Sequence, residues 1–382
     1  MFRKIFTATL VLACAALSAA AAAPVTKEFK ASSGGTLTLD LDAGAFVSIA
    51  GTGGSSVSVT YTLSCAPECA IRFDESGGGL AIRTSFEGDR DGKKSDISLD
   101  IRVPRSFDVK IDSKGGGVSI EGVEGKFDGK TMGGKLTLRD VEGEATLTTM
   151  GGEILVADST LDGALKTMGG AVTFVNVVGD VTGHSMGGNV RYKNVRRRDG
   201  GLAAPNRRGE GVEDVAPDSV QISTMGGAIE IEDAPEGADL HTMGGKISVA
   251  NARRFVRAKT MGGDVEIASV DGWVQATTMS GDIRVTVTGK GGDVTLTSYG
   301  GDVVLEVPRG FGMDLDLEIA YTRNAGQDYT IDAPGGLKPT VTPDWDRDHG
   351  SPRKYIRAKG AVQGGGNRVT IKTINGNIKI AE

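Results

Sequence analysis

The chain has 382 residues, a formal net charge of −6, 58 glycines and only 5% aromatic residues. This length accommodates two ordinary domains or one long repeat array, and the glycines are not spaced as in collagen. The mild acidity argues against nucleic acid or anionic lipid as a partner of the whole chain. The low aromatic content predicts a core of Val, Ile, Leu and Ala.

The N-terminal segment, 1–23, has the pattern of a secretory signal peptide. Arg3 and Lys4 precede an apolar run, and small residues follow up to Pro24; the run is too short for a transmembrane anchor. Cleavage leaves 41 of the 43 basic residues against 49 acidic ones, a net charge of −8. We expect an extracytoplasmic protein with no transmembrane segment in the mature chain. A retained anchor, or lipidation at Cys14, is the alternative.

Two cysteines follow the signal, in the sequence Cys65-Ala-Pro-Glu-Cys69. In an exported chain such a close pair predicts a disulfide. A metal site is the weaker interpretation because no second Cys/His pair accompanies them. A redox site is also weaker, since the spacing is one residue longer than Cys-x-x-Cys.

The tetrapeptide Thr-Met-Gly-Gly, or a close variant of it, recurs eight times. Its methionines follow one another at a fixed period, in two runs separated by a longer step: Met132, Met150, Met168, Met186, Met225, Met243, Met261 and Met279. Degenerate copies begin at Ser113, Ser298 and Thr373. A fixed internal period is the signature of a solenoid. The longer step predicts one extra loop, at about residues 196–217.

Short runs of alternating apolar residues flank each tetrapeptide, as in Leu136/Leu138 and Ala145/Leu147. Such alternation predicts strands with one buried face, and the period is too short to add a helix. The predicted fold is therefore an all-β parallel β-solenoid with coils of about 18 residues. The crossover rule favours a right-handed β-helix.

Two recurring features of the period are interpreted as corners of the coil. Thr131 and its equivalents continue the inward parity of the preceding strand, the glycines turn the chain, and the methionines fill the irregular corner. A ladder of methionines that binds Cu(I) is the alternative, because thioethers are soft ligands. Asp and Asn residues predict the second corner, since they tolerate left-handed backbone: Asp140, Asp158, Asn176, Asn194, Asp233 and Asn251.

These patterns predict four regions after one another along the chain. Residues 1–23 form the signal peptide, and residues 24–111 an N-terminal β cap that protects an edge strand. The repeats occupy 112–307, with the loop at about 196–217. Residues 308–382 form a C-terminal β segment that closes the solenoid, with a loop-rich stretch from Asn324 to Asn367.

The repeats resemble those of the bacterial β-strand-repeat proteins called putative adhesins, a family of unknown function. The resemblance rests on Val103-Pro104 before a strand, Val307-Pro308 late in the array, and the terminal sequence from Thr373 to Ile378. It implies an exported, non-enzymatic role at the cell surface or in the periplasm. It implies no catalytic residue and no cofactor.

Candidate chemical groups are few and poorly arranged for catalysis. His184 and His241 are expected on an outward ladder, two coils apart, with no carboxylate to orient them. Asp140 and Asp158 have the separation of a glycosidase pair, but Asn replaces Asp in the next coils. The sequence Asp344-Trp-Asp346-Arg-Asp348 resembles part of a calcium loop, without its glutamate.

Two features are candidate binding surfaces. The predicted loop carries clustered arginines that could contact an anionic polymer: Arg196, Arg197, Arg198, Arg207 and Arg208. Phe255 and Trp273 share an outward position on neighbouring coils, where exposed rings could contact a partner or a sugar. The alternatives are a solvated loop for the arginines and, for the two rings, lateral packing under a flanking loop.

The sequence therefore predicts a scaffold or binding protein whose partner is a surface polysaccharide or an envelope protein. A carbohydrate-active β-helix enzyme is the first alternative. Ice binding through the threonine ladder is a second, but it requires outward threonines.

Overall fold

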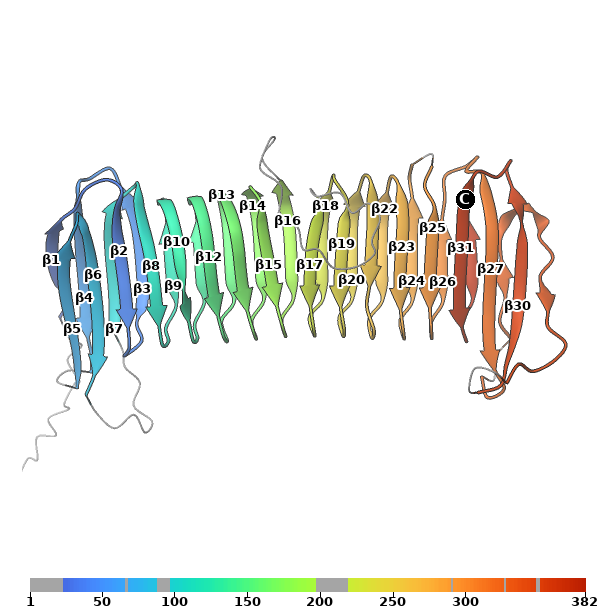
Figure 1. Ribbon diagram of the computed structural model, residues 1–382, viewed down its shortest axis with the longest axis horizontal. Helices are drawn as coiled ribbons and strands as arrows, with labels where there is room; N and C mark the ends of the chain where they lie inside the picture. Colours follow the sequence, from blue (N-terminus) through green and yellow to red (C-terminus); the bar gives the residue numbers. More distant parts are fainter. Residues whose placement is uncertain are drawn as a thin grey trace, which may run out of the picture.

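The computed structural model describes residues 23–65, 68–87, 97–196, 219–289, 291–325, 328–347 and 351–382. These residues form an elongated stack of short strands, with the N-terminal and C-terminal regions at opposite ends (Figure 1). The one helix among them is the single 3-10 turn Pro334–Gly336. In the described part of the chain no helix is long and apolar enough to cross a membrane. The predicted signal peptide lies outside the described residues, except for Ala23.

Each coil contributes one strand that leads into the Thr-Met-Gly-Gly turn and one that leaves it. The leading strands form what we call the entry sheet. Its strands, in spatial order, are β5 (Cys69–Ser76), β6 (Gly79–Phe86), β2 (Gly35–Leu41), β8 (Phe107–Ser113), β10 (Glu124–Thr131), β12 (Glu142–Thr149), the second half of β13 (Ile154–Thr167), β15 (Val181–Ser185), β17 (Val220–Thr224), β19 (Ala238–Thr242), β21 (Phe255–Lys259), β23 (Trp273–Thr278), β25 (Val294–Ser298), β31 (Asn367–Ile374), β27 (Met313–Thr322), β30 (Arg353–Val362) and β29 (Thr340–Val341).

The strands that leave the turn form the exit sheet, which lies opposite. In spatial order these are β1 (Val25–Lys30), β4 (Ser56–Leu63), β7 (Ile97–Pro104), β3 (Phe46–Thr52), β9 (Val118–Glu121), β11 (Leu136–Arg139), the first half of β13, β14 (Val172–Val178), β16 (Val190–Arg196), β18 (Ile229–Ala234), β20 (Ile247–Ala252), β22 (Val265–Val270), β24 (Ile283–Val287), β26 (Val303–Glu306), β32 (Ile378–Ala381) and β28 (Ile331–Asp332). Neighbouring strands of successive coils pair in parallel throughout the repeats.

The strand register follows the sequence period. Phe127 pairs with Ala145, which pairs with Gly163, so partners on successive coils are separated by one period of the repeat. Ser185 pairs with Thr224 across the longer step between the two runs. The coil therefore resumes its register after the predicted loop, most of which lies outside the described residues.

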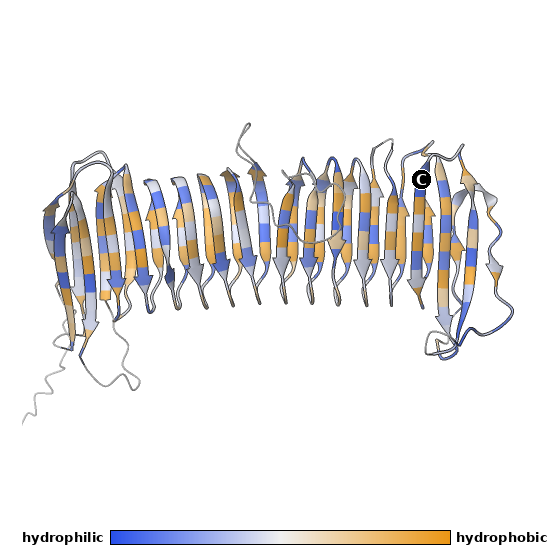
Figure 2. Ribbon diagram, in the orientation of Figure 1, coloured by the Kyte–Doolittle hydropathy of each residue, from blue (hydrophilic) through white to orange (hydrophobic). Residues whose placement is uncertain are grey.

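The core is a single apolar cluster between the two sheets. Inward residues alternate with outward polar ones along each strand, as Figure 2 shows by its banded colouring. Leu147 in the entry sheet and Ile154 in the exit sheet are each 1% exposed. Burial of these Val, Ile, Leu and Ala side chains, at roughly 25 cal/mol per Å², is the main stabilising term.

Both ends of the solenoid interleave strands out of chain order. The coil made by β2 and β3 lies between the one made by β6 and β7 and the one made by β8 and β9. At the other end β31 and β32 lie between β25/β26 and β27/β28. Antiparallel partners, β5, β4 and β30, then follow. The expectation that the chain from Asn324 to Asn367 is loop-rich is wrong in one part, because this stretch contains the long strand β30.

Candidate functional site

The threonines of the repeat are buried and bind the turn. Thr167 Oγ1 donates a hydrogen bond to the carbonyl of Gly152 on the preceding coil (2.8 Å) and accepts one from the amide of Gly170 (3.1 Å). Thr242 and Thr260 repeat this pattern. The threonines are 0–4% exposed, as their inward parity predicted. Buried hydroxyls of this kind offer no surface for ice binding.

The two glycines of the repeat have different surroundings. A Cβ at Gly152 would overlap the carbonyl oxygen of Gly134, whereas a Cβ at Gly151 would lie 3.9 Å from the Met132 carbonyl oxygen. Ser280 and Asn375 replace the first glycine in two copies, and the second glycine is kept in every copy. Close approach of adjacent coils therefore explains the second glycine only.

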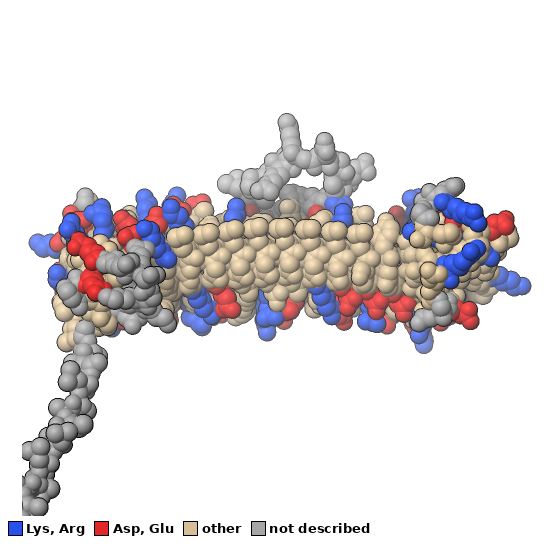
Figure 3. All heavy atoms as spheres, turned by 90° about the horizontal axis from the view of Figure 1, so that it is seen from below, with Lys and Arg blue, Asp and Glu red and all other residues tan. Residues whose placement is uncertain are grey.

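The methionines are not packed into the corner, and that interpretation is wrong. All eight are 44–56% exposed. We call this row, with its glycines, the Met ridge: Met132, Met150, Met168, Met186, Met225, Met243, Met261 and Met279. The ridge lies along the lower edge of the solenoid in Figure 1. Figure 3, viewed from that side, shows an uncharged band between two rows of charged side chains.

The opposite corner is built from Asp and Asn, as predicted. Asp140, Asp158, Asn176 and Asn194 have φ between 50° and 54°, a left-handed conformation that these residue types tolerate. Asn176 Nδ2 donates to Asp158 Oδ1 (2.8 Å), and Asn194 Nδ2 donates to Asn176 Oδ1 (2.9 Å). After the step between the two runs of repeats, Asp233 and Asn251 are not among the left-handed residues.

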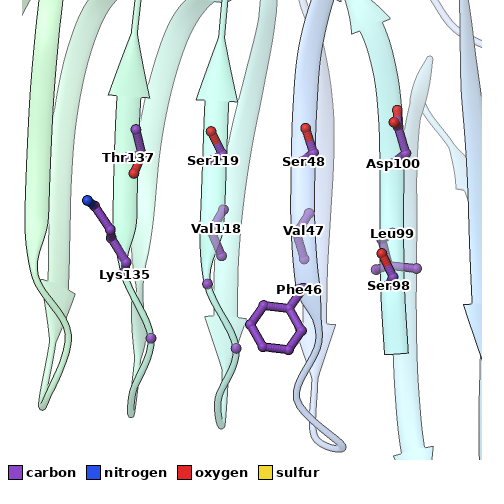
Figure 4. Close-up of a pocket in the computed structure, with 13 residues that line it drawn as sticks. Phe46, Val47, Ser48, Ser98, Leu99, Asp100, Val118, Ser119, Lys135 and Thr137 are labelled. Atoms are coloured by element: carbon purple, nitrogen blue, oxygen red, sulfur yellow. The ribbon is translucent and has the colours of Figure 1, made fainter. Parts of the chain in front are cut away.

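A shallow depression of about 590 Å³ lies on the exit sheet near the N-terminal end (Figure 4). Its most prominent side chain is Phe46, which is 61% exposed. Phe46 begins β3, where Val47 and Ile49 point into the core and Phe46 therefore points outward. A Cβ on Gly117, which directly precedes the adjacent strand β9, would lie 3.9 Å from Phe46 Cδ1. Because Gly117 has no side chain to cover the Phe46 ring, the edge and one face of the ring are accessible.

Small polar side chains surround the Phe46 ring in two rows. Ser48 pairs with Asp100 on one side and Ser119 on the other, and Ser119 pairs with Thr137. Closer to the turn, Phe46 pairs with Ser98 on one side, and Gly117, just before β9, lies on the other. Figure 4 shows these side chains on neighbouring strands beside the ring. We call this group the Phe46 depression.

Lys135 closes the far side of the Phe46 depression. Its Nζ lies 3.8 Å from Glu153 Oε2, with both side chains more than half exposed. Such an exposed ion pair contributes little to stability, so Lys135 can move toward a ligand at low cost. The depression therefore combines an aromatic face, several hydroxyl groups, the carboxylate of Asp100 and one cation.

The expected exposure of Phe255 is wrong. Its side chain is 2% exposed because the ring is covered by Trp273 on the next coil, with centroids 4.7 Å apart, and by Gly237 on the preceding coil, where a Cβ would overlap it. Trp273 itself is half-buried. The pair is thus a lateral stack rather than an open aromatic surface.

Arg257 adds a charged group to this stack. Its guanidinium lies 5.5 Å from the centre of the Trp273 ring, its Nε donates a hydrogen bond to Gln275 Oε1 (3.2 Å), and its Nη1 lies 3.6 Å from Asp239 Oδ2. Burial raises the pKa of the Asp239 carboxyl above its usual value, and the charge of Arg257 opposes that shift. These contacts stabilise the flank of the solenoid.

Of the arginines on the predicted loop, Arg196 ends β16 and is exposed. The others, Arg197, Arg198, Arg207 and Arg208, lie outside the described residues. Their role as a binding surface stays a prediction.

The candidate catalytic groups are not brought together. The register places His184 and His241 two coils apart, with Ser223 between them. Asp140 and Asp158 lie on adjacent coils, both exposed, and Asp158 also faces Arg139 at 3.8 Å. Their place in the Asp/Asn corner shows that backbone geometry accounts for both residues.

The remaining predictions concern Cys65, Cys69 and the three aspartates near residue 346. The structure joins the cysteines in a disulfide, with Cα atoms 5.5 Å apart. Asp346 accepts a hydrogen bond from the Tyr355 hydroxyl (2.9 Å). Asp348 lies outside the described residues, and within those that are described no group of three or more His, Cys, Asp or Glu side chains is arranged to hold a metal ion.

Sequence reasoning missed the Phe46 depression. The signal was present, since Phe46 has outward parity in the run Phe46-Val47-Ser48-Ile49. Its neighbours could not be named, because β3 pairs with β9, which lies far along the chain, and with β7 through an interleaved coil.

Comparison with solved structures gives distant likenesses. A putative cell adhesion protein from Clostridium sporogenes ATCC 15579 is 9% identical, with 94% of this chain and 99% of that chain covered and a TM-score of 0.20. A putative adhesin from Parabacteroides distasonis ATCC 8503 is 11% identical, with 75% and 98% covered and a TM-score of 0.30. A putative lipid binding protein from the same organism is 14% identical, with 75% and 90% covered and a TM-score of 0.22. No curated protein matches the chain significantly.

One family model matches the sequence itself, over residues 175–323, which run from β14 to the end of β27. This segment covers the end of the first run of repeats, the whole second run and the strands that follow it as far as β27. The resemblance to putative adhesins is confirmed, and this part of the chain is similar to the Toastrack DUF4097 family.

Proposed function

We propose that the protein is an exported, non-enzymatic, adhesin-like scaffold that binds a polysaccharide of the cell envelope through the Phe46 depression. The observation that carries this proposal is an exposed aromatic ring bordered by rows of hydroxyl groups. The proposed solenoid is a right-handed β-helix that holds this surface rigid. Export follows from the predicted signal peptide.

Sugar rings have an apolar face of C–H groups and a rim of hydroxyls. Phe46 offers a flat apolar surface for the first, and aromatic rings favour such stacking. Ser48, Ser119 and Thr137 each offer a hydroxyl that can donate or accept. They lie on β-strands, about 4.8 Å apart across the sheet, so a saccharide would meet a fixed array. A rigid site of this kind loses little entropy on binding.

The test is an array of glycans and polymers probed with the mature chain, residues 24–382, and with Phe46→Ala. Loss of the ring should weaken binding about tenfold, since a buried Phe contributes roughly 1.5–3 kcal/mol. Phe46→Tyr, which keeps the ring, should bind like the wild type. Val341→Ala is the matched control, because Val341 is also more than half exposed but lies at the opposite end.

Binding that survives Phe46→Ala but disappears when residues 196–217 are deleted would move the site to the arginine loop. No binding by the wild-type chain would contradict the polysaccharide proposal and direct the search to envelope proteins. Release of new reducing ends from a bound polymer would contradict the non-enzymatic part, and Asp140 and Asp158 would be substituted next.

A further inference from the structure

The chain uses methionine almost only on the Met ridge. Of its ten methionines, eight lie there, one is Met1, and the last is Met313, which is fully buried in β27. A chain that needed methionine for general packing would place it in the core, where flexible side chains fill gaps. Here the core is built from other residues, and methionine is placed in solvent.

The backbone does not require methionine at this position. In flanking coils the same position carries Lys114, Tyr299 and Ile374. Lys114 and Tyr299 are exposed, as the methionines are. A charged, an aromatic and a branched side chain are thus all compatible with the turn. The repeated choice of methionine therefore points to a property of the thioether sulfur.

Hydrogen bonds hold the methionines in register from coil to coil. Met168 N donates to Thr149 O (3.2 Å) and Gly169 N donates to Met150 O (3.0 Å). In the second run, Met243 N and Gly244 N both donate to Met225 O (3.2 and 3.0 Å). Successive methionines are therefore separated by the strand spacing of about 4.8 Å. A zinc–thiolate bond is about 2.3 Å long, and two metal–sulfur bonds of that order span nearly the same distance.

We propose that the Met ridge binds soft monovalent cations, Cu(I) or Ag(I), with each ion held between the thioethers of adjacent coils. Soft thioethers select such ions over Mg²⁺, Ca²⁺ and other cations that prefer oxygen. The sulfur atoms are neutral and half exposed, so binding requires no deprotonation. The inference does not depend on polysaccharide binding at the Phe46 depression.

Charge near the second run of repeats favours a cation. Asp264 and Asp282 follow Met261 and Met279 by three positions, and Asp302 continues their ladder. Their carboxylates are held in place by backbone amides: Asp264 Oδ1 accepts from Asp282 N (2.9 Å), and Asp282 Oδ1 accepts from Asp302 N (2.8 Å). Lys246 takes the same position after Met243, so the first ion should lie between Met261 and Met279.

The test compares two variants that keep four ridge methionines each. The alternating variant replaces Met150, Met186, Met243 and Met279 by Leu, so that no two thioethers remain on adjacent coils. The block variant replaces Met132, Met150, Met168 and Met186 by Leu, which leaves four adjacent thioethers. Both keep an apolar ridge and the same composition. Ag(I) binding to residues 24–382 is measured by calorimetry, and methionine methyl resonances are followed by NMR.

The wild-type chain should bind Ag(I) with shifts of the eight ridge methyls, while the buried Met313 methyl stays in place. The block variant should bind about half as many ions with similar affinity, and the alternating variant should bind at least tenfold more weakly. Equal Ag(I) affinity of the two variants would contradict a site formed by paired thioethers. Absence of Ag(I) binding to the wild-type chain would contradict the whole proposal. Thermal unfolding of each variant verifies that the fold is kept, and Ca²⁺ should cause no methyl shift.

Discussion

The Met corner and the Asp/Asn corner close the same coils, but their regularity has different causes. At the Asp/Asn corner, four residues have φ of 50–54°, and only residue types that tolerate this conformation are found. At the Met corner, close approach of the chain restricts the second glycine and leaves the methionine position open. A repeated residue that the backbone requires is explained by folding, whereas one that the backbone does not require needs a functional reason.

The largest expected effect is the difference in the free energy of unfolding between alanine substitutions at the two glycines of one repeat. Gly152→Ala should destabilise the fold by about 4 kcal/mol or more, because the new Cβ would overlap the Gly134 carbonyl oxygen of the preceding coil. Gly151→Ala places a Cβ at ordinary contact distance, 3.9 Å from Met132 O, and should change the free energy of unfolding by less than about 1 kcal/mol. Denaturant unfolding of both variants measures the difference. Equal destabilisation would show that the conformation of the turn restricts both positions, and not only the close contact of residue 152 with the Gly134 carbonyl oxygen.

The buried hydroxyl of the Met corner should have the next largest effect. Thr167→Val leaves the Gly152 carbonyl and the Gly170 amide without their partner, and buried unpaired groups cost about 1–3 kcal/mol each. We expect a loss of roughly 2–6 kcal/mol in the free energy of unfolding, measured with denaturant. Thr167→Ser keeps the hydroxyl and should lose less than half as much, since Ser185 makes the same bonds in the next coil. Similar losses for Val and Ser would assign the effect to packing instead.

Much of this fold could be predicted from the sequence because the repeats determine local structure. The period placed Thr131, Thr149 and Thr167 on one inward ladder and Asp140 and Asn176 at a corner, and the structure agrees. These features depend on residues close together in the chain, so parity and turn chemistry suffice.

Features that depend on distant pairing could not be predicted. Phe46 gains its neighbours Ser98 and Ser119 only because β2 and β3 are inserted between later strands. Phe255 is buried because Gly237 leaves space for its ring on the preceding coil, and parity alone indicates exposure. The exposure of the methionines is not predictable from residue type either, because an apolar side chain at a corner is compatible with both packing and exposure.

The smallest expected effect is the difference in stability between asparagine substitutions at the Asp/Asn corner of the first and of the second run of repeats. Asn176→Ala should cost about 1–2 kcal/mol, because a left-handed conformation strains residues with a Cβ and no local hydrogen bond, and the amide bonds to Asp158 and Asn194 are lost. Asn176→Gly should restore most of the stability. Asn251→Ala is the matched control, since Asn251 is not left-handed, and it should stay within about 0.5 kcal/mol of the wild type. Amide hydrogen exchange in β14 and β20 measures the local free energy of opening, because unfolding of a long repeat array need not be two-state. Equal costs at Asn176 and Asn251 would show that the left-handed backbone conformation does not set the cost of losing asparagine at this corner.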